Sequence, residues 1–177
     1  MNEQHIAIWQ QAAGAWDQRW QAVQADQWEA QTPCSEWNVQ QLCDHTIQTQ
    51  ATFAAGLVGA EVAPDAAWPD VHAAINARLE DPSCLDGTTE MPGMGVVPKA
   101  MVFGVASSDM LIHSWDLARS IGADEELPAQ AVTACYMGLQ KFPEQARVGP
   151  GMFDQPAACA DDASEQTQFL SFAGREV

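Results

Sequence analysis

Apolar residues recur along this chain at the three- and four-residue spacing of an amphipathic helix. The first such segment runs from about residue 3 to 28, with an unusually aromatic stripe of Trp9, Ala13, Trp16, Trp20 and Val23. A second helix is predicted to begin after Asn38, because Asn38 is a good N-cap and Gln41 completes a capping box. It runs to about Gly59 and presents along one side Leu42, His45, Thr49, Thr52 and Phe53.

The remaining segments continue the helical pattern with interruptions. A third, shorter helix is predicted over residues 66–80, with apolar positions at Trp68, Val71, Ile75 and Leu79. Residues 82–98 contain three prolines and three glycines, which predicts a long irregular connection with room for a short hairpin. The fourth helix begins near Pro98 and ends at Gly122, and a fifth lies between Pro128 and Pro143. Residues 147–164 are predicted as loop, and Ser164 could cap a last short helix through Ala173.

This pattern predicts an all-α fold. Four substantial amphipathic helices around a common core form a four-helix bundle, here with additional short helices and a long irregular connection before helix four. The length of 177 residues suits a single domain spanning 1–177.

The charge balance narrows the classes of partner. The chain has 24 acidic residues and 7 lysines and arginines, for a net charge of −17. Such a surface repels nucleic acid and anionic lipid, so we expect neither as a partner. No apolar run approaches the roughly 20 residues of a membrane span, and the N-terminus does not resemble a signal peptide, so a cytoplasmic location is expected. The five cysteines lack metal-finger or disulfide-framework spacing and are interpreted mostly as reduced, buried apolar residues.

The candidate chemistry lies on the second and fourth helices. Asp109 and His113 are four residues apart and therefore project from one face of the fourth helix, while His45 lies on the inner side of the second. Two imidazole nitrogens and a carboxylate oxygen form a reasonable zinc set and leave a coordination position open. The residues alone also allow a structural interpretation, in which His45 is a hydrogen-bonded core residue and Asp109 and His113 form an ordinary intrahelical pair.

Three stretches resemble a known family: "TPCSEWNVQQLCDHT" at 32–46, "DMLIHSWDLARSIGAD" at 109–124 and "FLSFAGRE" at 169–176. They are similar in content, order and separation to the DinB-like bundle superfamily, specifically the actinobacterial branch related to mycothiol-dependent maleylpyruvate isomerase. The resemblance implies a divalent metal, usually zinc, held at the positions of His45, Asp109 and His113. This chain departs from the isomerase in having Asp109 where the isomerase has glutamate, and the isomerase carries a further C-terminal domain that helps bind its thiol.

Other residues of these stretches receive subsidiary interpretations. Trp115 should face away from the metal, and Asp116 and Arg119 are spaced to pair on the helix surface. Asp116 could instead accept the free ring N–H of His113. Arg175 is a candidate for binding an anionic substrate or cofactor, and a solvated terminal charge is the alternative.

The leading functional hypothesis is a metal-dependent thiol S-transferase or isomerase that joins a small-molecule thiol of the mycothiol type to a small electrophile. A metal-bound water acting as hydrolytic nucleophile is a variant of it. The alternative is a non-catalytic, structural or stress-related metal-binding bundle, for which a homodimer is one form; a buried polar cluster without metal is a further one. A set of two histidines and one carboxylate accepts Zn²⁺ but also Ni²⁺, iron or manganese.

Overall fold

The structure is a computed structural model that describes residues 2–91, 94–149 and 153–177. Its helical elements are α1 (Asn2–Ala22), α2 (Val39–Thr49), the π-helical turn η1 (Gln50–Ala54), α3 (Ala55–Val58), α4 (Trp68–Leu79), the 3-10 turn η2 (Pro82–Leu85), α5 (Lys99–Ile121), α6 (Ala129–Leu139), the 3-10 turn η3 (Glu144–Ala146) and α7 (Glu165–Phe172). The strands β1 (Thr88–Met91) and β2 (Gly95–Pro98) pair with each other.

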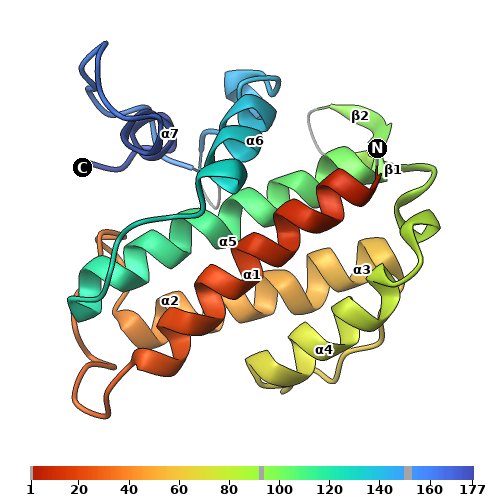
Figure 1. The fold of residues 1–177 in the computed structure, drawn as a ribbon, viewed down its shortest axis with the longest axis horizontal. Helices are drawn as coiled ribbons and strands as arrows, with labels where there is room; N and C mark the ends of the chain where they lie inside the picture. The colour runs from red at the N-terminus through yellow and green to blue at the C-terminus, as the bar shows by residue number, and fades with distance from the viewer. Residues whose placement is uncertain (1, 92–93, 150–152) are drawn as a thin grey trace.

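Four helical segments form the bundle, as predicted. They are α1, the continuous α2–η1–α3 segment, α4 and α5 (Figure 1). The two longest helices, α1 and α5, lie side by side. α6 packs against α1 and α5 on the side away from α4, and α7 packs against α6. The core contains four fully buried tryptophans, Trp9, Trp16, Trp68 and Trp115. The rings of Trp16 and Trp68 meet edge to face with centroids 6.4 Å apart, which ties α1 to α4.

The helix ends follow the chemistry read from the sequence. The Asn38 side chain accepts from the backbone N–H of Gln41 at 2.9 Å, and the Gln41 side chain accepts from the N–H of Asn38 at 3.0 Å, so the capping box is formed. α5 ends at Gly122, whose φ of 70° lies in the left-handed region that glycine adopts without strain. Ser164 caps α7 by accepting from the N–H of Thr167.

The long connection before α5 contains the short hairpin. β1 and β2 pair antiparallel, with Thr89 opposite Val97. Pro92 and Gly93, which follow β1 in the sequence, lie outside the described residues, as do residues 150–152 of the predicted loop 147–164. α5 begins at Lys99, directly after the last residue of β2, so the hairpin leads straight into the first turn of that helix.

The first helix is shorter than predicted. α1 ends at Ala22 rather than near residue 28, since the chain then turns to meet the start of α2. The carbonyls of Ala30 and Trp28 accept from the backbone N–H groups of Val39 and Gln40, both at 3.0 Å. These tertiary hydrogen bonds replace those of a longer helix and anchor the loop that precedes α2.

The predicted inner side of the second helix is wrong in its last part. Thr52 is exposed and Phe53 is 37% exposed, because the π-helical turn η1 shifts the register of the helix. The core positions are taken instead by Gln50 and Ala54, both fully buried. His45 precedes this turn, so its placement on α2 is unaffected.

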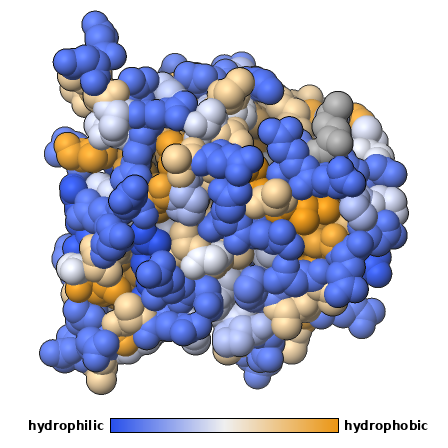
Figure 2. Space-filling view, viewed as in Figure 1, coloured by the Kyte–Doolittle hydropathy of each residue, from blue (hydrophilic) through white to orange (hydrophobic). Residues whose placement is uncertain are grey.

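One face of the molecule is drawn in Figure 2, which shows a largely hydrophilic surface on which apolar residues form separate patches. Within the described residues, no helix combines the length and the apolar character needed to cross a membrane.

Candidate metal centre

α5 carries three ionisable side chains on its inner side, one turn apart. Asp109, His113 and Asp116 follow one another at steps of four and three, the spacing at which helical side chains lie on one face. Most of α5 is apolar and buried, so these groups are brought into the interior with it. The His113 side chain is 5% exposed and that of Asp116 is fully buried. Burial of this kind demands partners for each charge.

The structure brings the predicted ligands together. His45, from α2, faces α5, and its Nε2 lies 3.9 Å from Asp109 Oδ1. The Nε2 of His113 lies 3.5 Å from the same oxygen. The two imidazole rings are almost perpendicular, at 84°, with centroids 5.1 Å apart. Ligand atoms bound at about 2 Å in a tetrahedron lie roughly 3.3 Å from one another, so this spacing needs only a small contraction to hold one ion.

Asp109 supplies an independent test of fit. Its Oδ2 is buried and has no hydrogen-bond partner among the described residues. A buried carboxylate oxygen without a partner is costly, and such atoms are rare in folded proteins. A cation beside Asp109 would satisfy this oxygen, so the residues present fit a divalent metal.

Two carboxylates surround the His113 ring. Asp116 Oδ2 lies 2.9 Å from Nδ1 of His113, opposite the side that faces Asp109. The position of Asp116 as an acceptor for the His113 ring, one of the two predicted alternatives, is confirmed. A carboxylate in this position fixes the tautomer in which Nε2 is free to bind a metal.

The predicted surface pair of Asp116 with Arg119 is wrong. Arg119 instead donates to Glu125, at 3.1 and 2.9 Å, and its guanidinium lies 4.3 Å from the Trp115 ring. Asp116 is fully buried and binds a different arginine, Arg175, which is 7% exposed. Arg175 donates through Nε to Oδ1 at 3.1 Å and through Nη2 to Oδ2 at 2.7 Å.

Arg175 is therefore not a solvated terminal charge. Its Nη1 donates to the carbonyl of Ala173 at 2.9 Å, so each of its three nitrogens has a protein acceptor. It lines the cavity described below, but its hydrogen-bonding groups are occupied by Asp116 and the backbone. An anionic ligand would have to compete with these contacts.

The electrostatics of the site favour a cation. Burial alone would raise the pKa of the Asp109 carboxyl, but His113 and His45 outweigh it and hold that pKa well below its usual range. Burial would lower the pKa of His113, but Asp109 and the hydrogen bonds to Asp109 and Asp116 raise it well above its ordinary value. The groups that stabilise a proton on His113 also stabilise a metal ion, which competes with that proton for the ring.

Sequence reasoning missed two residues of the loop before α2. The interpretation of the cysteines as mostly buried apolar residues gives Cys34 no role at the site, yet its Sγ lies 3.4 Å from Asp116 Oδ2 and 3.3 Å from Arg175 Nη2. The ring of Trp37 lies against that of His45 in a tilted arrangement, with centroids 4.5 Å apart. Both belong to the "TPCSEW" segment directly before the capping box, and this proximity to His45 was the available signal. Cys43 and Cys135 do fit the buried interpretation, and burial raises their pKa to about 12 and about 11.

A second set of metal-ligand types shares His113. One ligand atom each of Cys34, His113 and Asp116 lies within 4.8 Å of the other two. Arg175 already binds both oxygens of Asp116, and its positive charge repels a cation there. Among the described residues, no lysine or arginine forms an ion pair with Asp109, so the set of His45, Asp109 and His113 is the better candidate.

The candidate site opens into a cavity of about 600 Å³. Its wall includes the three predicted ligands together with Trp37, Arg147 and Phe142. A volume of this size accommodates a small organic ligand. Trp115 is buried and is not part of this wall, in agreement with the prediction that it faces away.

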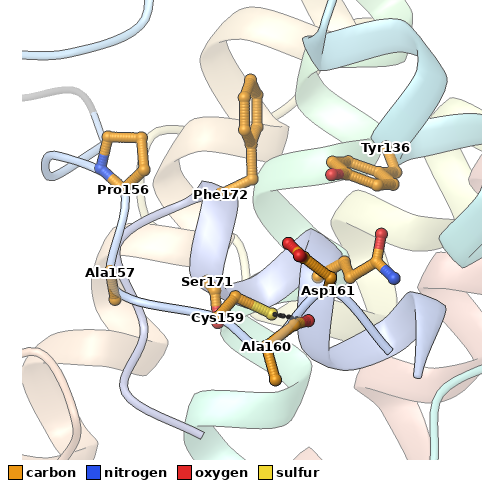
Figure 3. Close-up of a pocket in the computed structure, with 9 residues that line it drawn as sticks. Tyr136, Pro156, Ala157, Cys159, Ala160, Asp161, Ser171 and Phe172 are labelled. Carbon is orange, nitrogen blue, oxygen red and sulfur yellow. Dashed lines mark hydrogen bonds between the residues drawn. The ribbon is translucent and has the colours of Figure 1, made fainter. Parts of the chain in front are cut away.

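A smaller hollow of about 260 Å³ lies between Tyr136, the 156–161 segment and α7 (Figure 3). It contains the thiol of Cys159, which is directed to the carbonyl of Ala160 at 3.6 Å, and the carboxylate of Asp161. None of the described residues that line it is a histidine, so it offers a poorer set of metal ligands than the larger cavity.

Comparison with known proteins supports the relation suggested by the three sequence stretches. A family model described as the mycothiol maleylpyruvate isomerase N-terminal domain matches residues 9–82, a segment that contains His45. Two proteins of Mycobacterium tuberculosis, uncharacterized protein MT0763 of strain CDC 1551 / Oshkosh and uncharacterized protein Rv0738 of strain ATCC 25618 / H37Rv, are each 31% identical over 163 residues. The alignments cover 88% of this chain and 88% of each relative. No solved structure matches the chain. With a bundle fold and relatives aligned along most of its length, this chain belongs to the family of the DinB-like mycothiol maleylpyruvate isomerase N-terminal domain.

Proposed function

We propose that this protein binds a divalent metal ion, Zn²⁺ in the first place, through His45, Asp109 and His113. We further propose that it uses the site with a small thiol of the mycothiol type to transfer sulfur to, or isomerise, a small electrophile. The observation that carries the proposal is the convergence of three ligand atoms from α2 and α5, namely His45 Nε2, His113 Nε2 and Asp109 Oδ1. The other oxygen of that carboxylate, Oδ2, is buried without a hydrogen-bond partner among the described residues, which supports the same proposal. The choice of a mycothiol-type thiol is based on the family to which the chain belongs.

The chain provides three protein ligands, and three ligands leave a coordination position for an external group. A zinc ion bound there would lower the pKa of a coordinated thiol and so supply a thiolate near neutral pH. Asp116 orients His113 by accepting its Nδ1–H, and Trp37 covers one side of His45. The cavity beside these residues holds the body of the thiol or the electrophile and excludes water from part of its surface.

Arg147 is the residue best placed to meet an anionic group on the electrophile. It lines the cavity, its Nε is buried with no hydrogen-bond partner in the described part of the chain, and its guanidinium lies 4.0 Å from the Phe172 ring. None of the described carboxylates approaches it within 4.0 Å. In a chain with only seven lysines and arginines, such a cation in the cavity favours a negatively charged substrate group.

The first experiment tests metal binding. Metal-free protein is titrated with Zn²⁺ by calorimetry, and His113→Ala is expected to abolish tight binding. His72→Ala is the matched control, because His72 stacks on Trp68 with centroids 5.0 Å apart and lines no part of this cavity. Asp109→Glu, which restores the side chain of the isomerase, should retain the metal, whereas Asp109→Asn should weaken binding by about 100-fold or more, the upper range for even indirect contacts to a metal.

The second experiment tests catalysis. Zinc-loaded protein is incubated with mycothiol, or N-acetylcysteine as a simpler thiol, and with 1-chloro-2,4-dinitrobenzene or an unsaturated dicarboxylate as electrophile. Thiol consumption that EDTA abolishes and Zn²⁺ restores supports the proposal. Tight zinc binding without turnover on a broad panel of electrophiles indicates the non-catalytic metal-binding bundle, and wild-type protein that cannot be loaded with any divalent metal overturns both.

A further inference from the structure

Arg175, which binds Asp116, lies near the C-terminal end of the sequence. Arg175 follows α7 and is 59 residues from Asp116 in sequence, yet it binds both oxygens of the carboxylate. Two parallel N–H···O bonds between a guanidinium and a carboxylate fix the plane of both groups, which a single contact does not do. The orientation of Asp116 inside the bundle is therefore set by the C-terminal segment.

The same carboxylate sets the orientation of a predicted metal ligand. Asp116 Oδ2 accepts from the Nδ1–H of His113 at 2.9 Å and simultaneously from Arg175 Nη2 at 2.7 Å. Both carboxylates beside the ring can only accept, and Asp116 is the nearer of the two, at 2.9 Å against 3.5 Å for Asp109. The single hydrogen of a neutral His113 is therefore assigned to Nδ1, and Nε2 presents its lone pair toward Asp109 and His45. A rotation of Asp116 would turn this ring or break its hydrogen bond.

The cap of α7 delivers Arg175 to this position. The N–H of Arg175 donates to the carbonyl of Leu170 at 2.9 Å, and that of Gly174 donates to Ser171 at 3.0 Å, the pattern of a Schellman motif. Gly174 has a φ of 87°, which glycine adopts freely. The guanidinium also donates to Ala173 at 2.9 Å and to the Cys34 sulfur at 3.3 Å. Both the backbone N–H and the guanidinium of Arg175 are therefore held by hydrogen bonds.

We propose that Arg175 is a positioning residue of the metal site: acting through Asp116, it holds the His113 ring in the orientation that binds the ion, so that the C-terminal segment sets metal affinity. The proposal rests on the metal-binding half of the proposed function and not on the thiol chemistry. It replaces a role for Arg175 as an anchor for substrate.

The alternative is that Arg175 only compensates the buried charge of Asp116 and so serves the fold. A double-mutant cycle separates the two roles, because residues that act through one another give non-additive effects. Arg175→Met, Asp116→Asn and the double variant are compared for zinc affinity by competition with a chromophoric chelator. Each is measured at a temperature where circular dichroism shows it fully folded.

We expect Arg175→Met to weaken zinc binding by about 10- to 100-fold, the range found for residues that orient metal ligands. In the Asp116→Asn background the same change should cost less than about 2-fold, since its effect has already been removed. Arg175→Lys keeps the charge but lacks the planar fork, so it should recover stability while zinc affinity stays reduced. The visible spectrum of the Co²⁺-loaded protein should shift in Arg175→Met, because it reports ligand geometry.

Arg119→Met is the matched control. Arg119 lies on α5, the helix that carries Asp116, and links it to the C-terminal segment by donating to the carbonyl of Glu176 at 3.3 Å. Its other hydrogen bonds go to Glu125, and it touches none of the proposed ligands. Its zinc affinity should match wild type within about 2-fold. The proposal is overturned if folded Arg175→Met binds zinc as wild type does, or if the losses in the cycle are additive. Wild-type protein that binds no metal would instead overturn the proposed function itself.

Discussion

The indole ring of Trp37 lies against the imidazole of His45, with ring centroids 4.5 Å apart and an interplanar angle of 36°. The ring centroids of Trp37 and His113 are 5.9 Å apart, so Trp37 borders both proposed imidazole ligands. The His45 side chain is 35% exposed and accordingly has room to rotate. The tryptophan therefore limits the rotamers of the one ligand that packing does not otherwise hold.

Replacing this tryptophan should weaken metal binding without unfolding the protein. Aromatic pairs contribute roughly 0.5–1.5 kcal/mol beyond their area, so Trp37→Ala is expected to reduce zinc affinity by about 2- to 10-fold in calorimetric titration. Trp37→Phe keeps an aromatic face and should remain near wild type. Equal affinity in all three proteins would show that His45 is either held by other contacts or does not bind the ion.

The two helices that carry the proposed ligands are joined by the buried amide of Gln50, the first residue of the π-helical turn η1. The Gln50 side chain accepts from the indole N–H of Trp9 and donates to the carbonyl of Ala106, both at 3.0 Å. Gln50 is fully buried. This single side chain therefore connects η1 with α1 and α5.

Gln50→Ala should lower the free energy of unfolding by about 1–3 kcal/mol, because it leaves the buried N–H of Trp9 without a partner. Urea denaturation followed by circular dichroism measures the loss. Gln48→Ala is the control, since Gln48 is an exposed residue of the same helix, and its effect should stay within about 0.5 kcal/mol. If the two variants lose the same stability, the hydrogen bonds of Gln50 are not a main connection of the bundle.

Local signals predicted the bundle well and the surroundings of the site poorly. Three predictions depended only on residues close together in sequence: the capping box at Asn38, the helix end at Gly122, and the shared face of Asp109 and His113. The structure contains all three features. The π-helical turn that begins at Gln50 has no such signal among neighbouring residues, and the hydrogen-bond partners of the Gln50 side chain lie on two other helices. The same holds for Arg175, whose pairing with Asp116 depends on how the C-terminal segment packs.

The cavity makes a prediction about substrate charge. Arg147 has an unpartnered Nε within the described residues, while Asp154 and Glu36 also line the wall, so an anionic group is expected at Arg147 and not elsewhere in the cavity. Hydrogen bonds to charged groups contribute about 1.5–3 kcal/mol. Arg147→Met should therefore reduce kcat/KM for a carboxylate-bearing electrophile by roughly 10- to 100-fold.

The same variant supplies an internal control, because the neutral electrophile 1-chloro-2,4-dinitrobenzene makes no charged contact. Its kcat/KM should change by less than about 3-fold in Arg147→Met, and zinc affinity should not change. A parallel loss for the charged and the neutral electrophile would assign Arg147 to the shape of the cavity and not to recognition of charge.

Gly174 offers a way to move Arg175 without altering either member of its ion pair. A Cβ atom at this position would lie 2.5 Å from Asp154 Cβ and 3.1 Å from the carbonyl oxygen of Gln155, and the φ of 87° is strained for any side chain. Gly174→Ala should therefore displace the turn that carries Arg175. We expect a loss of about 1–3 kcal/mol in the free energy of unfolding and weaker zinc binding in the folded protein, as for Arg175→Met.

Gly138→Ala in α6 is the matched control, since a Cβ there meets nothing within 4 Å and helical alanine is favoured over glycine. It should leave zinc affinity unchanged and stabilise the protein by up to about 1 kcal/mol in urea denaturation. Lowered stability together with wild-type zinc affinity in Gly174→Ala would mean that the turn serves the fold alone. A loss of both stability and zinc affinity would show that the C-terminal turn helps to orient His113, because the substitution touches neither Asp116 nor any proposed ligand.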